Sequence, residues 1–119
     1  MNSMKMLEVA IFLKEFKKLA ACSEVDIFVK RTEFGNAFID IGITLSDALN
    51  ELLSLSIDNY CSGPEPDKDR PGSVWEFGKN IEGKEVYIKL KIAEIAGKKY
   101  AKCISFHKAK FPMCYPLKK

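Results

Sequence analysis

Apolar and polar side chains alternate strictly along residues 85–92 of this chain. One set of alternate positions is entirely apolar and consists of Val86, Ile88, Leu90 and Ile92. The other set is polar and consists of Glu85, Tyr87, Lys89 and Lys91. Because successive side chains of a strand point to opposite faces of a sheet, this pattern predicts a half-buried strand whose polar row faces outward.

The neighbouring residues predict two further strands, so that residues 69–107 form a three-stranded meander. The three strands are expected over residues 74–79, 85–93 and 99–106. Tight turns are indicated around Glu82-Gly83 and Gly97-Lys98, because glycine readily adopts the backbone conformations that short hairpin turns require.

Helical spacing dominates the first half of the chain. Residues 4–21 predict an amphipathic helix, and residues 33–41 fit a short helix and a strand about equally, with the helix preferred. Between them, residues 25–30 are β-branched and aromatic enough for a strand. The apolar stripe expected on the first helix consists of Met4, Leu7, Ala10, Ile11, Leu13, Phe16, Leu19 and Ala20.

A further helix is predicted over residues 45–54. Thr44 is its expected N-cap, and Asp47 lies in its first turn, where the helix dipole favours a carboxylate. Its expected buried residues are Leu45, Ala48, Leu49, Leu52 and Leu53. Residues 57–62 predict a short extended segment, and residues 63–72 are dense enough in Pro, Gly and Asp to predict an irregular loop.

Helices followed by a meander indicate the α+β class, with an antiparallel sheet and helices packed on one face. At 119 residues the chain (1–119) has the length of a single domain. The tail, residues 108–119, contains two prolines and is interpreted as either a final edge strand or a strap across the sheet.

Charge is distributed unevenly between the two halves. Residues 1–60 carry six Lys or Arg against nine Asp or Glu, a net charge of −3, and residues 61–119 carry thirteen against seven, a net charge of +6. A basic half of this kind favours a negatively charged partner, with nucleic acid the first candidate. The alternative is a Lys-rich surface that maintains solubility and blocks edge pairing.

The four cysteines are spaced irregularly and the chain has one histidine, so no metal or other cofactor is expected. Charged residues interrupt the apolar N-terminal segment, which argues against a signal peptide or a membrane span. We therefore expect a cytoplasmic protein without a membrane partner, whose cysteines remain buried thiols.

Several motifs of the second half resemble one known family. Residues 59–79 read NY-x-SGP-x-PD-x-DRPG-x-VW-x-FGK, residues 81–92 read IEGKEVYIKLKI, residues 102–107 read KCISFH, and Tyr115-Pro116 follows. In this order the motifs are similar to the MqsR family of bacterial and archaeal toxins. The resemblance implies a RelE-like fold, a metal-independent endoribonuclease that cleaves mRNA, and a cognate antitoxin protein as partner.

The resemblance also implies site residues. In the founding branch these are a lysine, a glutamine after a tryptophan, a strand tyrosine and a C-terminal lysine. Glu76 stands at the glutamine position and Tyr87 at the tyrosine position. The C-terminal lysine falls at His107 or just beyond it, and the first lysine aligns near Ser62, where Lys68 or Arg70 is a possible substitute.

Metal-free RNA cleavage needs a base for the ribose 2′-hydroxyl, an acid for the leaving oxygen, and positive charge near the phosphate. His, Glu and Tyr can transfer protons, and His has an ordinary pKa of about 6.5. The expected catalytic residues are His107, Tyr87, Lys89 and Glu76. The expected RNA-binding residues are Lys91, Arg70, Lys79, Trp75 and Lys110.

Each candidate also has a purely structural interpretation. Trp75 is then a core anchor, Glu76 faces away from Tyr87, and Arg70 pairs with an acidic neighbour in its loop. The lysines are then a solvated strand face. At the level of function, the alternatives are a non-catalytic RNA-binding or degenerate toxin module, and an interaction protein whose sheet edge pairs with a partner strand.

Overall fold

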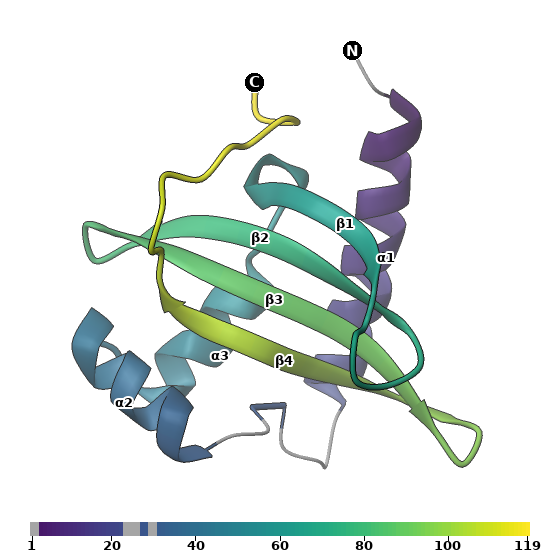
Figure 1. The fold of residues 1–119 in the computed structure, drawn as a ribbon, viewed down its shortest axis with the longest axis horizontal. Helices are drawn as coiled ribbons and strands as arrows, with labels where there is room; N and C mark the ends of the chain where they lie inside the picture. The colour runs from purple at the N-terminus through teal and green to yellow at the C-terminus, as the bar shows by residue number, and fades with distance from the viewer. Residues whose placement is uncertain (1–2, 23–26, 29–30) are drawn as a thin grey trace.

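The computed structural model describes residues 3–22, 27–28 and 31–119, and it confirms the α+β class. Within these residues, three helices lie behind one four-stranded antiparallel sheet of order β1-β2-β3-β4 (Figure 1). The helices are α1 (Ser3–Ala21), α2 (Arg31–Ile41) and α3 (Leu45–Leu53), followed by a 3₁₀ turn, η1 (Ile57–Asn59). The strands are β1 (Tyr60–Pro66), β2 (Ser73–Ile81), β3 (Lys84–Ile95) and β4 (Lys98–Lys108).

Two short hairpins hold β2, β3 and β4 together. The first turn has positive φ at Glu82 (54°) and Gly83 (77°), and the second at Ala96 (53°) and Gly97 (79°). Positive φ at both central residues is the backbone of a type I′ turn, whose twist matches that of the flanking strands. The second turn therefore begins one residue earlier than predicted.

The core lies between the sheet and the helices. Val86, Ile88 and Leu90 of β3 are fully buried on the helix-facing side, as their alternation predicts. Phe12 of α1 stacks on Trp75 of β2 at a ring-centroid distance of 4.5 Å. These contacts attach α1 to the middle of the sheet.

The predicted buried faces of two helices are wrong in part. Leu7 and Ile11 of α1 are 59% and 61% exposed, and Leu45 of α3 is 55% exposed. The buried stripe of α1 instead consists of Val9, Phe12, Leu13, Phe16 and Ala20. The predicted cap of α3 is confirmed, because the Thr44 hydroxyl accepts from the Asp47 backbone and the Asp47 carboxylate accepts from the Thr44 backbone.

A β-bulge in β4 decides which of its residues face the core. Lys89 pairs with Ser105 and Leu90 pairs with Cys103, so Ile104 is an extra residue on β4. Because of this insertion, Cys103 and Phe106 are both buried although they are three positions apart, a spacing that places side chains on opposite faces of a regular strand. His107 then lies opposite Tyr87, on the face away from the helices.

Both edges of the sheet are protected. Phe28 forms an isolated parallel bridge with Cys103, which covers part of the β4 edge. The rest of the strand predicted over residues 25–30 lies outside the described residues. On the other edge, β1 runs through Pro64 and Pro66 into the segment predicted to be a loop. Prolines are tolerated there because an edge strand has hydrogen-bonding partners on one side only.

The tail is a strap, the second of the two predicted possibilities. Residues 109–117, here named the strap, cross the sheet face opposite the helices (Figure 1). The Glu85 carboxylate accepts from Tyr115 Oη at 2.9 Å and from the Met113 backbone at 3.3 Å. Gly78 leaves room for this crossing, because a Cβ atom there would lie 2.6 Å from Tyr115 Oη and 2.8 Å from Met113 Sδ.

Within the described ranges, no helix combines the length and the apolar character that a membrane span requires. The four cysteines carry free thiols. Cys103 is buried as expected, whereas Cys61 is half-buried and Cys22 and Cys114 are exposed.

Candidate functional site

Two aromatic residues form the centre of the open face, the sheet face away from the helices. Tyr87 of β3 and His107 of β4 occupy paired positions, and their rings lie 5.2 Å apart with an interplanar angle of 31°. Side chains directly opposite each other on one face of an antiparallel pair are close enough to pack together. The structure thus brings together two of the four predicted catalytic residues through strand register alone.

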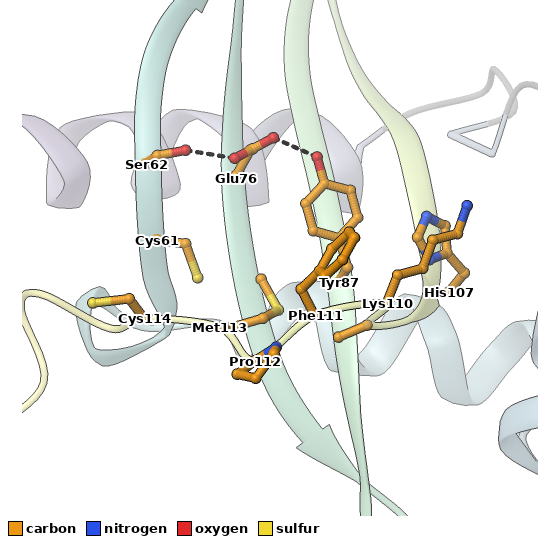
Figure 2. A pocket seen from close by; sticks show the side chains of 11 residues that line it. Cys61, Ser62, Glu76, Tyr87, His107, Lys110, Phe111, Pro112, Met113 and Cys114 are labelled. Atoms are coloured by element: carbon orange, nitrogen blue, oxygen red, sulfur yellow. Dashed lines mark hydrogen bonds between the residues drawn. The ribbon is translucent and has the colours of Figure 1, made fainter.

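Glu76 of β2 joins this pair. Its carboxylate accepts a 2.6 Å hydrogen bond from the Ser62 hydroxyl of β1 and a short one from the Tyr87 hydroxyl, as Figure 2 shows. Lys89, its direct neighbour on β3, lies 4.0 Å away from the same carboxylate. Glu76 therefore shares the open face with Tyr87 and Lys89, and it is Trp75 that points the other way.

These contacts shift the pKa of both groups of the Glu76–Tyr87 pair. Burial by itself would raise the Glu76 pKa, but the hydrogen bonds from Ser62 and Tyr87 and the charge of Lys89 outweigh it, so the pKa is lowered. Burial, the hydrogen bond to Glu76 and the nearby negative charge raise the pKa of Tyr87. At neutral pH the pair consequently consists of a carboxylate and a protonated phenol.

His107 has one ring nitrogen held by the backbone. Its Nδ1 lies 2.9 Å from the Lys108 carbonyl oxygen, and a carbonyl can only accept a hydrogen bond. Nδ1 is therefore the protonated nitrogen, which leaves Nε2 to accept or donate the exchanging proton.

The strap and these residues together line an open cleft of about 410 Å³, named here the strap cleft (Figure 2). The sheet contributes Cys61, Ser62, Glu76, Tyr87 and His107, and the strap contributes Ala109, Lys110, Phe111, Pro112, Met113 and Cys114. Of the predicted RNA-binding residues, Lys110 lies here. Clefts of this volume accommodate small-molecule ligands or single nucleotides.

Sequence reasoning missed several residues of the cleft wall. The family resemblance identifies Ser62 only as the position near which a lysine aligns, and nothing in the neighbouring sequence predicts its hydrogen bond to Glu76. Phe111 and Met113 belong to the tail, whose path depends on the distant Glu85. The one available signal was the mixture of Lys, Phe and Tyr in a Pro-containing tail.

Three predicted RNA-binding residues lie elsewhere. Trp75 is 8% exposed and stacks on Phe12, in agreement with its interpretation as a core anchor. Lys79 points to the helix side, where its Nζ lies 2.6 Å from the Glu51 carboxylate and donates to Ser54. Lys91 is 4% exposed and is covered by the loop that follows β1. Trp75 and Lys91 are therefore buried, whereas Lys79 is partly exposed but lies on the helix side, away from the open face.

The loop over Lys91 is built around an ion pair. Lys91 Nζ lies 2.5 Å from the Asp67 carboxylate, and this contact together with a hydrogen bond from the Asp69 backbone lowers the Asp67 pKa to about 2. Arg70 of the same loop is exposed and lines a second cleft of about 440 Å³, which also contains Lys102. Asp67 is thus paired with Lys91, and Arg70 lies at the far end of the open face from the strap.

Among the described residues, no three His, Cys, Asp or Glu side chains are grouped so that they could hold a metal ion. Comparisons with models of protein families, with curated proteins and with solved structures found no match to this chain. Function is therefore inferred from the strap cleft and its chemistry.

Proposed function

We propose that this protein is an MqsR-like toxin with a RelE-like fold, which cleaves single-stranded mRNA without a metal ion. The observation that carries the proposal is the grouping of Glu76, Tyr87 and His107 in one nucleotide-sized cleft. Lys89 and Lys110 add positive charge beside them. The motifs shared with the MqsR family support the same activity.

In the proposed reaction the ribose 2′-oxygen attacks the adjacent phosphorus. The Glu76 carboxylate takes the 2′-hydroxyl proton, since two of its lone pairs are engaged by Ser62 and Tyr87 and the others remain available. Protonated His107 gives its Nε2 proton to the 5′-oxygen as the P–O bond breaks. The products are a 2′,3′-cyclic phosphate and a 5′-hydroxyl, and Lys89 stabilises the charge of the phosphorane.

Tyr87 positions the base in this scheme. Its hydroxyl proton is held by Glu76, and its raised pKa keeps it a donor at neutral pH. Its ring contacts the His107 ring, so one side chain sets the distance between the proposed base and the proposed acid. Effective proton transfer requires that both groups are placed before the substrate reacts.

The test is cleavage of an unstructured RNA by the purified protein in EDTA, with the RNA ends analysed for cyclic phosphate. We expect His107→Ala and Glu76→Gln each to reduce the rate by roughly 100- to 10,000-fold, the usual contribution of general acid–base catalysis. Tyr87→Phe should lose at least about tenfold, because Glu76 loses a donor that positions it. Lys79→Gln is the matched control, since Lys79 lies on the helix side and should leave the rate unchanged.

Wild-type rates in both His107→Ala and Glu76→Gln would exclude these residues as acid and base.

A specific observation favours one alternative, a non-catalytic RNA-binding module. Each oxygen of Glu76 already accepts a hydrogen bond, as expected of a carboxylate with a structural role. That alternative predicts salt-dependent RNA binding without new RNA ends.

An antitoxin partner is part of the proposal. Met4, Leu7 and Ile11 form an exposed apolar stripe on α1, and such stripes are typical of protein-binding surfaces. Expression of the chain alone should arrest growth, and co-expression of the neighbouring reading frame should relieve the arrest. Arrest that the neighbour does not relieve would argue against this pairing.

A further inference from the structure

Phe111 is an exposed aromatic residue on an anchored stretch of backbone. Its side chain is 79% exposed although it borders the strap cleft. Pro112 restricts it to extended backbone conformations, and Met113, two residues away, is hydrogen-bonded to Glu85. Because this backbone is already anchored at Met113, less conformational freedom is lost when a ligand packs against the Phe111 ring.

The cleft offers a second aromatic surface from the sheet. Tyr87 and His107 form it, and Met113 adds a polarisable thioether to the same cleft (Figure 2). Lys110 precedes Phe111 in the chain and supplies a positive charge at the cleft. Aromatic surfaces next to a cation are the elements with which proteins bind single-stranded nucleic acid, since each base can stack and each phosphate is negative.

We propose that Phe111 is a base-stacking residue, and that the strap cleft binds one nucleobase of the RNA between Phe111 and the Tyr87–His107 surface. This inference builds on the proposed function for its ligand, but base binding does not require cleavage. Stacking would place the neighbouring ribose and phosphate beside Glu76 and Lys89. Because all bases have a π-face, we expect Phe111 to increase affinity with little preference among bases.

The favoured ligand is RNA and not a protein. Lys110 and His107 accompany Phe111 in the cleft, whereas the exposed apolar residues of α1 form a separate surface with Lys5 and Glu8. A protein docked through Phe111 alone would gain nothing from the aromatic pair beneath it. Loss of partner-protein binding in Phe111→Ala with unchanged RNA binding would overturn the proposal in favour of a protein site.

The experiment uses a short single-stranded oligonucleotide in which 2′-fluoro groups replace all 2′-hydroxyls, so that it cannot be cleaved. One position carries the fluorescent base 2-aminopurine, whose emission is quenched by stacking. We expect quenching on binding to the wild-type protein, and about 5- to 100-fold weaker binding with lost quenching for Phe111→Ala. Phe111→Trp should retain the affinity, and Ile39→Ala, at a comparably exposed apolar residue of α2, should leave the oligonucleotide affinity unchanged.

An abasic nucleotide at the reporter position provides the second arm. It should weaken binding to the wild-type protein but not further weaken binding to Phe111→Ala, because the stacking partner is already absent. Hydrogen exchange of the Met113 amide should be the same in both proteins, which shows that the strap is still in place.

Equal affinities of the wild-type protein and Phe111→Ala, or no oligonucleotide binding by either, would overturn the inference. Cleavage of ordinary RNA is measured separately, so the two proposals can fail independently. Binding that depends on Phe111 without any RNA cleavage would refute only the nuclease proposal. An RNA cleavage rate that is unchanged in Phe111→Ala would refute only the stacking role.

Discussion

Glu85 holds the strap, so its removal should open the strap cleft without unfolding the domain. Its carboxylate accepts hydrogen bonds from Tyr115 Oη at 2.9 Å and from the Met113 backbone at 3.3 Å. Hydrogen bonds to charged groups contribute about 1.5–3 kcal/mol each. Because the site is partly exposed and one bond is long, we expect about 2–3 kcal/mol for the two together.

The perturbation is Glu85→Ala, and the observable is hydrogen exchange. A loss of 2–3 kcal/mol corresponds to about 30- to 150-fold more frequent opening of the strap, and the Met113 amide should exchange faster by the same factor. Glu85→Gln retains one acceptor oxygen and should give an intermediate value. Glu94→Ala, at an exposed position of the same strand, is the matched control.

The midpoint of urea unfolding should change much less than the exchange of the strap, since the packing between α1 and the sheet does not involve Glu85. The affinity for RNA should decrease as the strap opens more often, because Phe111 then no longer lines the strap cleft. A Met113 amide that exchanges at the wild-type rate in Glu85→Ala would refute the assignment of Glu85 as the anchor.

Two further predictions concern stability. The Asp67 pKa is lowered from 3.8 to about 2, so its stabilising contribution is fully present above pH 3.8 and is lost as the pH falls through 2. Asp67→Asn should therefore flatten the decrease of the unfolding free energy between these pH values in urea titrations, and an unchanged slope would contradict the ion pair with Lys91. Trp75→Ala should destabilise the protein by about 3–5 kcal/mol in urea unfolding, since Trp75 is buried against Phe12. Weaker RNA binding at unchanged stability would instead return Trp75 to the RNA-contacting surface.

Local patterns were sufficient for the three strands of the meander and for the capped helix, but not for β1, whose residues 63–66 were predicted to be part of a loop. The meander follows from period-two alternation and from glycine at two turns, and α3 follows from Thr44 and Asp47, all of which act within a few residues. The orientation of α1 could not be obtained in this way. Apolar residues occur on most of its circumference, and tertiary contacts such as those of Phe12 with Trp75 and Phe77 select the stripe that is buried.

The residues of the candidate site likewise divide into those that local alternation predicts and those that only the tertiary structure places. Alternation places Tyr87 and Lys89 together on one face, but it also places Lys91 there, which the structure buries against Asp67. The bulge at Ile104 is equally invisible to a strict alternation, and it determines that Phe106 packs inward while His107 faces Tyr87.

The amino-acid sequence by itself determined the three helices and the three strands of the meander, because turns, caps and alternation depend on near neighbours. It also determined which side chains of β3 lie on the same side. Only the tertiary structure decided which part of that side is reached by solvent, since residues 67–72 cover one end and the strap covers the other. These coverings depend on contacts such as Glu85 with Tyr115, which join segments 30 residues apart and leave no periodic trace in the chain.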